Sequence, residues 1–211
     1  MQIDIIFNIV IIVFSVVIHE VSHGYMANFL GDPTARLQGR LTLNPISHLD
    51  PFGSVILPLM LSLSSSPLLF GWAKPVPYNP YNLRRGGLWS EALVAGAGPA
   101  SNLAIALMFA LFIRIGSNMG VSESVLALSL MVVGINVMLA LFNLVPIPPL
   151  DGSKILSAIL PRGMAQRWEV VRVQLEQNLL FGFGAVILFV MLLGPLLGGT
   201  VRSVAYFLAG I

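Results

Sequence analysis

His19, Glu20 and His23 form the pattern HEVSH near the end of an apolar run. In a helix the two histidines lie four residues apart, on one face and one turn from each other. Both imidazoles can then bind one Zn²⁺, which takes histidine nitrogens at roughly 2.0–2.1 Å. Glu20 lies beside such a metal without being needed as a ligand, the position of a general base acting on water. The alternative is that all three are polar residues on a helix surface at a membrane boundary.

The depth of the motif argues against that alternative. Residues 5–18 are almost wholly apolar. With a rise of 1.5 Å per residue, His19 lies about 20 Å along a helix from Ile5, inside a hydrocarbon layer roughly 30 Å thick. Ionisable groups are costly at that depth and usually functional. We therefore expect a catalytic zinc site within the membrane.

A catalytic zinc site usually has a third protein ligand. The chain has no cysteine, so this ligand must be a histidine or a carboxylate. Asp151 is the strongest candidate because it follows the proline-broken run NLVPIPPLDG, and such a break in a spanning segment should line a cavity. Capping of a following helix by Asp151 is an equally good explanation from the spacing alone. His48 is better explained by a local contact in a loop than by zinc ligation. Glu91 is better explained by its position in the first turn of a helix, which the helix dipole favours for an acidic residue.

The elements that must position these residues are membrane helices. Hydrophobic residues make up 56% of the 211-residue chain and charged residues only 9%, against about 25% in soluble proteins. We expect an all-α polytopic membrane protein with about four to six transmembrane or re-entrant helices. Phe52–Leu63 is too short to span simply and is expected to re-enter the membrane or lie on it. Four segments are long enough to span: about 5–29, 91–113, 125–145 and 178–197, the last running on to 208 unless its glycines and Pro195 break it.

Between the first two long spans the sequence changes character. Residues 35–44 and 70–80 mix alternating apolar residues with Gly, Pro and Asn, which predicts a small β-hairpin insertion. An exposed edge there could bind an extended substrate, or the sheet could close the mouth of the site. No second soluble domain is visible, so residues 1–211 are expected to form one membrane domain with a core of about 5–160 and a C-terminal membrane helix of about 178–208.

Basic residues predict the orientation in the membrane. Only Arg114 and Arg202 fall on the side of the expected N-terminus, which therefore lies outside, while the site opens toward the cytoplasm. The first apolar segment has no basic start and no cleavage site, so it is expected to stay in the mature cell-membrane protein. The charge is too scattered for nucleic-acid binding. The other side carries Arg36, Arg40, Lys74, Arg84, Arg85, Lys154, Arg162, Arg167 and Arg172.

HEVSH, GPASN at 98–102 and NLVPIPPLDG at 143–152 together resemble the site-2 protease family of intramembrane zinc metalloproteases. GRLTLNPISHLDPFG and GWAKPVPYNP are similar to a prokaryotic branch of that family, and the resemblance covers most of residues 15–155. No PDZ module or CBS pair accompanies it, so regulation stays open.

The resemblance implies that His19, His23 and Asp151 bind one Zn²⁺ and that Glu20 is the catalytic base. Asn143 matches a residue thought to assist substrate binding or the oxyanion, and Asn102 matches a motif position of less clear role; each can also be an interhelical hydrogen bond. The implied activity is hydrolysis of peptide bonds in or near the transmembrane segments of protein substrates. The motifs are compatible with a homo-oligomer and with a regulatory membrane partner. The rivals are a non-catalytic zinc-binding or transport protein, another peptidase with a Glu ligand, and a catalytically inactive relative.

Overall fold

The computed structural model describes residues 2–56, 60 and 73–211. In this part of the chain, four helices are long and apolar enough to cross a membrane, which confirms an all-α polytopic fold. Their boundaries lie within a few residues of those expected, except that the second extends further toward the C-terminus; the fourth reaches the longer of its two expected ends. The long helices are α1 (Gln2–Leu30), α4 (Ser90–Asn118), α5 (Glu123–Asn143) and α8 (Leu179–Ala209).

Shorter helical elements connect the spans. Between α1 and α4 lie α2 (Thr34–Leu37), the 3₁₀ turns η1 (Pro45–His48), η3 (Pro80–Asn82) and η4 (Gly87–Trp89), and the π-helical turn η2 (Pro51–Ile56). Between α5 and α8 lie α6 (Asp151–Ile159) and α7 (Arg162–Gln177).

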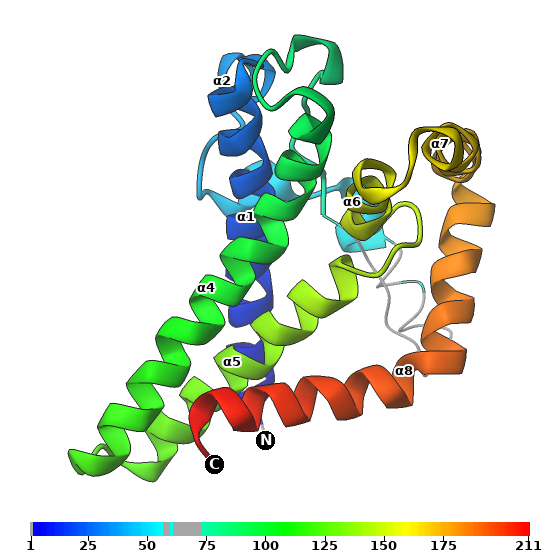
Figure 1. Ribbon diagram of the computed structural model, residues 1–211. Helices are drawn as coiled ribbons and strands as arrows, with labels where there is room; N and C mark the ends of the chain where they lie inside the picture. The colour runs from blue at the N-terminus through cyan, green and yellow to red at the C-terminus, as the bar shows by residue number, and fades with distance from the viewer. Residues whose placement is uncertain (1, 57–59, 61–72) are drawn as a thin grey trace.

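Helices α1, α4 and α5 pack against one another, and α8 closes back onto α4 and α5. Figure 1 shows that α8 descends from α7 and then bends sharply, so that its second part crosses α5. The helix contains Pro195, and a proline inside a helix removes one hydrogen bond and commonly causes a kink. The sequence did not decide whether Pro195 and the glycines around it break this segment. In the structure α8 continues as one helix and bends.

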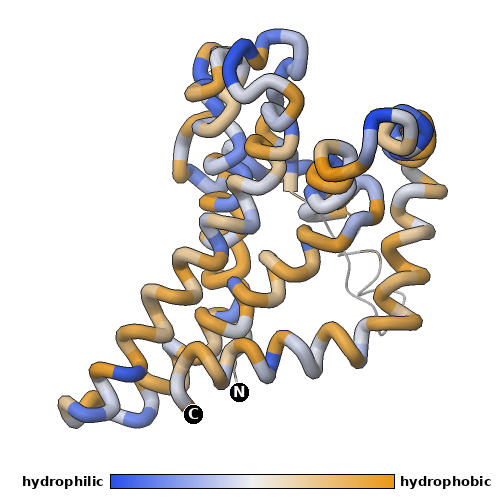
Figure 2. Tube along the Cα trace, viewed as in Figure 1, coloured by the Kyte–Doolittle hydropathy of each residue, from blue (hydrophilic) through white to orange (hydrophobic). Residues whose placement is uncertain are grey.

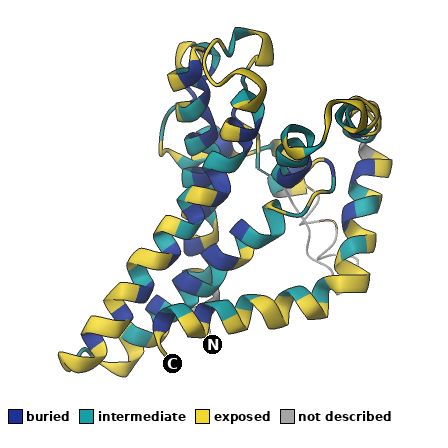
Figure 3. Cartoon of the chain, viewed as in Figure 1, coloured by how far each residue is buried: buried dark blue, intermediate teal, exposed yellow. Residues whose placement is uncertain are grey.

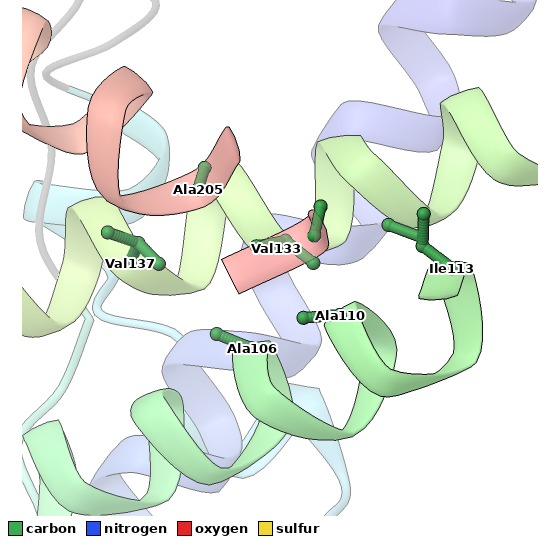
Figure 4. Packing of buried hydrophobic residues seen from close by; sticks show 7 residues of the cluster. Ala106, Ala110, Ile113, Val133, Val137 and Ala205 are labelled. Carbon is green, nitrogen blue, oxygen red and sulfur yellow. The ribbon is translucent and has the colours of Figure 1, made fainter. Parts of the chain in front are cut away.

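Small residues form the buried core where α4, α5 and α8 meet. Ala106 and Ala110 of α4 face Val133 and Val137 of α5, and Ala205 of α8 covers them (Figure 4). Alanine lets helix backbones approach closely, which favours packing where lipid removes the usual hydrophobic drive. Figure 3 shows buried residues concentrated where the helices face one another, while much of the outer surface of α8 is exposed.

Polar residues gather at the two ends of the bundle, and apolar residues dominate the spans between them (Figure 2). The N-terminus lies at the end opposite α2, α6 and α7 (Figure 1). These three elements carry five of the nine basic residues that were predicted to share one side: Arg36, Lys154, Arg162, Arg167 and Arg172. The fold therefore agrees with the alternation of sides on which the predicted orientation depends.

The expected β-hairpin insertion is wrong for the described residues, which contain no strand. Residues 34–37 form the helical turn α2, and residues 73–79, the extended segment, lie in no strand. Side chains satisfy the extended backbone instead: Glu20 accepts from the Val76 N–H, and Arg40 donates to the carbonyls of Lys74 and Pro75. Prolines at 75 and 77 also remove donors that a ladder would need. Residues 70–72 lie outside the described part, and so do residues 57–59 and 61–63 of the segment Phe52–Leu63; residues 52–56 of that segment belong to η2.

Candidate metal centre

Asp151, at the start of α6, meets His19 and His23 of α1, although Asp151 is 132 residues from His19 in the sequence. The carboxylate atom Asp151 Oδ2 lies 3.1 Å from His19 Nε2 and 3.3 Å from His23 Nε2. The two imidazole rings meet edge to face, with centroids 4.7 Å apart. Within the described chain they are the group of metal-ligating side chains close enough to hold one ion, with all three donor atoms within 4.8 Å of one another. Tertiary structure therefore joins the HEVSH helix to the LDG turn.

A directed chain of hydrogen bonds fixes the protonation of His19. Asn136 Nδ2 donates to the Val132 carbonyl, so Asn136 Oδ1 accepts from Asn102 Nδ2 at 2.9 Å. Asn102 Oδ1 then lies 2.6 Å from His19 Nδ1. An amide oxygen can only accept, so Nδ1 of His19 carries the proton and Nε2 presents its lone pair toward Asp151. Both asparagines are fully buried, which excludes water as a competing partner.

His23 is oriented in the same way by a backbone group. Its Nδ1 lies 2.7 Å from the Val94 carbonyl of α4, which can only accept a hydrogen bond. The proton therefore sits on Nδ1, and Nε2 is free to bind a metal. Both histidines thus have the tautomer that metal binding requires, and each is set by α4.

The close approach of α4 requires Gly98. A Cβ atom at this position would lie 2.5 Å from His23 Nε2 and 2.6 Å from His19 Nε2, closer than any real Cβ contact. The GPASN motif of α4 therefore contributes a glycine that makes room for the two imidazoles and an asparagine, Asn102, that orients one of them. Neither contact follows from the sequence, since each joins α4 to α1.

Asp151 is held at the first turn of α6 and does not cap it. The helix begins at Asp151 itself, after Leu150, and has no side-chain cap. The carboxylate instead points at the two histidines. A Cβ on Gly152 would overlap the Leu144 carbonyl, so glycine allows the turn to fold tightly against the end of α5. The proline run ends α5 at Asn143 and lets the chain return with Asp151 facing α1.

Glu20 lies one residue from His19 and is bound to a different partner. Its Oε2 accepts a hydrogen bond of 2.9 Å from the Val76 N–H in the extended segment 73–79. Glu20 is therefore an ionisable group next to the three donors and not one of them, as the HExxH pattern predicts.

Asp32 and Arg40 hold the extended segment in place. Asp32, fully buried, accepts from the Asn79 N–H at 2.7 Å and from Asn82 Nδ2 at 2.9 Å. Burial raises the pKa of this carboxyl, but its hydrogen bonds with Thr34, Asn82 and Asn79 outweigh burial and hold the pKa below its ordinary value. Neither Asp32 nor Asn136 was singled out from the sequence. Asn136 could have been found because it is a polar residue within an apolar span.

Three residues weighed from the sequence are not among the three donors. Asn143 donates to the Leu139 carbonyl of its own helix. His48 is buried in η1 and contacts the Thr42 carbonyl, the local loop contact expected for it. Glu91 lies 3.6 Å from Arg172 of α7 and outside the donor group.

Charged side chains of α6 and α7 contact the elements around the site. Arg172 is buried and forms ion pairs with Glu169, Glu176 and Glu91. Burial lowers the pKa of its guanidinium, but the hydrogen bond and charge of Glu169 and the other carboxylates raise the pKa above its ordinary value. Lys154, one turn after Asp151, lies over the Tyr78 ring at 5.3 Å from its centroid. This contact links the helix of Asp151 to the segment that binds Glu20.

The donor set fits a zinc ion. Four ligands at roughly 2.0–2.1 Å in a tetrahedron lie about 3.3 Å from one another. The two histidine–aspartate separations, 3.1 and 3.3 Å, match that spacing, and all three donor atoms lie within 4.8 Å of one another, within reach of one ion. Two imidazole nitrogens and one carboxylate oxygen are also ligands that zinc accepts, leaving one position for water or substrate.

Comparison with known proteins agrees with this site. Residues 112–191, which include Asp151, match the model of peptidase family M50. The chain is 36% identical over 195 residues to the protein named Putative zinc metalloprotease YwhC of Bacillus subtilis, covering 89% of this chain and 80% of that protein. It is 31% identical over 199 residues to Putative zinc metalloprotease Rip2 of Mycobacterium tuberculosis, covering 92% of this chain and 69% of the relative. No solved structure matches.

Fold and site thus define a multi-pass membrane metallopeptidase. The chain belongs to peptidase family M50, the site-2 protease family that its motifs resemble. The expectation of a zinc metalloprotease is confirmed, and with it the preference for an enzyme over a zinc transporter.

Proposed function

We propose that this peptidase hydrolyses peptide bonds within or next to the transmembrane segments of other proteins, with Zn²⁺ held by His19, His23 and Asp151. The observation that carries the proposal is the position of both histidines inside the apolar helix α1, which is long enough to span a bilayer. A site at that depth is accessible to substrate segments that are themselves in the membrane.

A zinc ion bound by these donors supplies Lewis-acid activation of water and of the scissile carbonyl. Glu20 acts as the general base: it takes a proton from the attacking water and passes it to the leaving amine nitrogen. The Val76 N–H holds Oε2 of Glu20, so Oε1 is the atom available for the proton. Asn102 positions His19 and does not touch substrate. Asn143 uses one Nδ2 hydrogen on the Leu139 carbonyl, so its second Nδ2 hydrogen is the one that its proposed role at the oxyanion or substrate would use.

Glu20→Gln tests the central role. The variant should retain zinc, because Glu20 is not among the three donors, and should lose cleavage of a co-expressed single-span protein by about 10²–10⁴-fold. Zinc content of the purified protein and product on an immunoblot are the measurements. Undiminished cleavage by the zinc-loaded variant contradicts the role of Glu20.

We further propose that the chain forms one cell-membrane domain with its N-terminus outside and its site opening toward the cytoplasm. The grouping of α2, α6 and α7 opposite the N-terminus supports this orientation (Figure 1). Cysteines introduced at Ser117 and at Arg167, which lie at opposite ends of the bundle, should be labelled by an impermeant maleimide from outside and from the cytoplasm, respectively. The reverse pattern contradicts the orientation.

A further inference from the structure

A mostly aliphatic cavity of about 260 Å³ lies beside α1, and none of the three donor residues lines it. One wall is formed by α1 and includes Val13, Val16 and Val17. The opposite wall includes His48 of η1, Gly53 of η2 and Ala73 at the start of the extended segment. Such a volume accommodates one large aliphatic or aromatic side chain.

Each wall of this cavity includes residues close to Glu20 or to the segment that binds it. Val16 and Val17 precede Glu20 by four and three residues, so their side chains lie one turn before it on the same side of the helix. Ala73 begins the segment whose Val76 N–H binds the Glu20 carboxylate. The cavity is therefore next to the proposed catalytic base, on the side where α1 continues deeper into its apolar part.

The opposite wall is fixed by hydrogen bonds. The buried His48 bonds through Nε2 to the Thr42 carbonyl at 2.8 Å, and its own carbonyl accepts from the Lys74 N–H at 2.9 Å. Arg40, also buried, donates to the Lys74 and Pro75 carbonyls at 3.0 and 3.3 Å. Turn η2 is tied by a 2.6 Å bond from the Gly53 N–H to Asp50. These bonds connect the wall to the same segment that holds Glu20.

We propose that this cavity is a substrate subsite, which takes one large apolar side chain next to the scissile bond and thereby selects where a transmembrane segment is cut. The proposal rests on the proposed role of Glu20. The occupant follows from the place of the cavity: an aliphatic pocket on the membrane side of the base meets the part of a substrate that is still in the hydrocarbon layer, whose side chains are apolar.

Val16→Phe tests the subsite by filling the cavity from α1. The zinc-loaded enzyme is co-expressed with a library of single-span proteins randomised around the centre of the span, and the cut positions are mapped by mass spectrometry. Wild type should enrich Leu, Ile, Met or Phe at one position flanking the cut. The variant should lower the ratio of large to small residues there by about tenfold, the scale on which a pocket discriminates by side-chain size.

Ala73→Leu fills the cavity from the other wall and should shift the ratio in the same direction. Val10→Phe is the matched control, because Val10 is 45% exposed on α1 and does not line the cavity; it should leave the ratio as in wild type. Zinc content of each variant reports whether the metal site has formed.

An unchanged ratio in both cavity variants, a uniform loss for all residues, or no apolar preference in wild type would each overturn the subsite. A lipid tail in the cavity would give the uniform loss. Cleavage that persists in Glu20→Gln would instead contradict the proposed function, so the two failures are distinguishable.

Discussion

Asn102 Oδ1 lies 2.6 Å from His19 Nδ1, and this contact determines which nitrogen of His19 can bind a metal. The two residues come from different spans and are 83 positions apart in the sequence. Because Asn102 also bonds Asn136, the proton on His19 is fixed by a chain that ends at a backbone carbonyl of α5. Three of the four long helices thus determine the state of one zinc ligand.

Replacing Asn102 by Leu should weaken zinc binding by about 10–100-fold, the usual cost of losing a group that orients a metal ligand. His19 would keep its place but lose the acceptor that holds its proton on Nδ1. Competition with a chelator gives the affinity. Asn143→Leu is the control, since Asn143 bonds only within its own helix and should keep wild-type affinity. Equal affinities for both variants would show that the Asn102 contact does not support the metal.

Gly98→Ala should remove zinc while leaving the helices folded. The added methyl group would lie 2.5–2.6 Å from both Nε2 atoms, in the space where the donors converge. Gly96→Ala is a matched control on the same helix, because a Cβ there meets nothing within 4 Å. Metal content per chain and helical circular dichroism separate loss of the site from loss of the fold. Full zinc content in Gly98→Ala would contradict the packing of α4 on the histidines.

Asp151→Asn should lose zinc more severely than Asn102→Leu, since it replaces a charged donor and not its support. Glu91→Gln should retain zinc, because Glu91 pairs with Arg172 and lies outside the donor group. Zinc content after dialysis compares the two. The reverse result would favour a peptidase whose third ligand is a glutamate.

Arg172→Leu should loosen α7, because three carboxylates lose their common partner. These carboxylates are partly exposed, so we expect a cost of about 1–3 kcal/mol, below that of a fully buried pair. Hydrogen exchange across Arg162–Gln177 measures the opening of the helix. Arg167→Leu, at an exposed position of the same helix, should leave exchange unchanged. If the amides of α7 exchange as slowly in Arg172→Leu as in wild type, the ion pairs do not hold α7 in place.

The extended segment 73–79 shows where sequence reasoning failed. Its alternation of apolar residues and prolines predicted a hairpin, since alternation is the usual sign of a half-buried strand. The chain instead satisfies these backbone groups with Glu20 and Arg40, which are distant in the sequence. Local patterns describe what a segment can pair with, whereas the partner actually present depends on the packing of the whole chain.

The sequence by itself determined the four long helices, the placing of His19, Glu20 and His23 on one of them, and the break that ends in Asp151. Each follows from local spacing and hydrophobicity, which act within a few turns of helix. Tertiary structure alone decided that Asp151 faces the histidines and does not cap α6, that Asn102 and Gly98 shape the metal site, and that Val76 holds Glu20. These are contacts between distant segments, and their geometry exists only once the helices have packed.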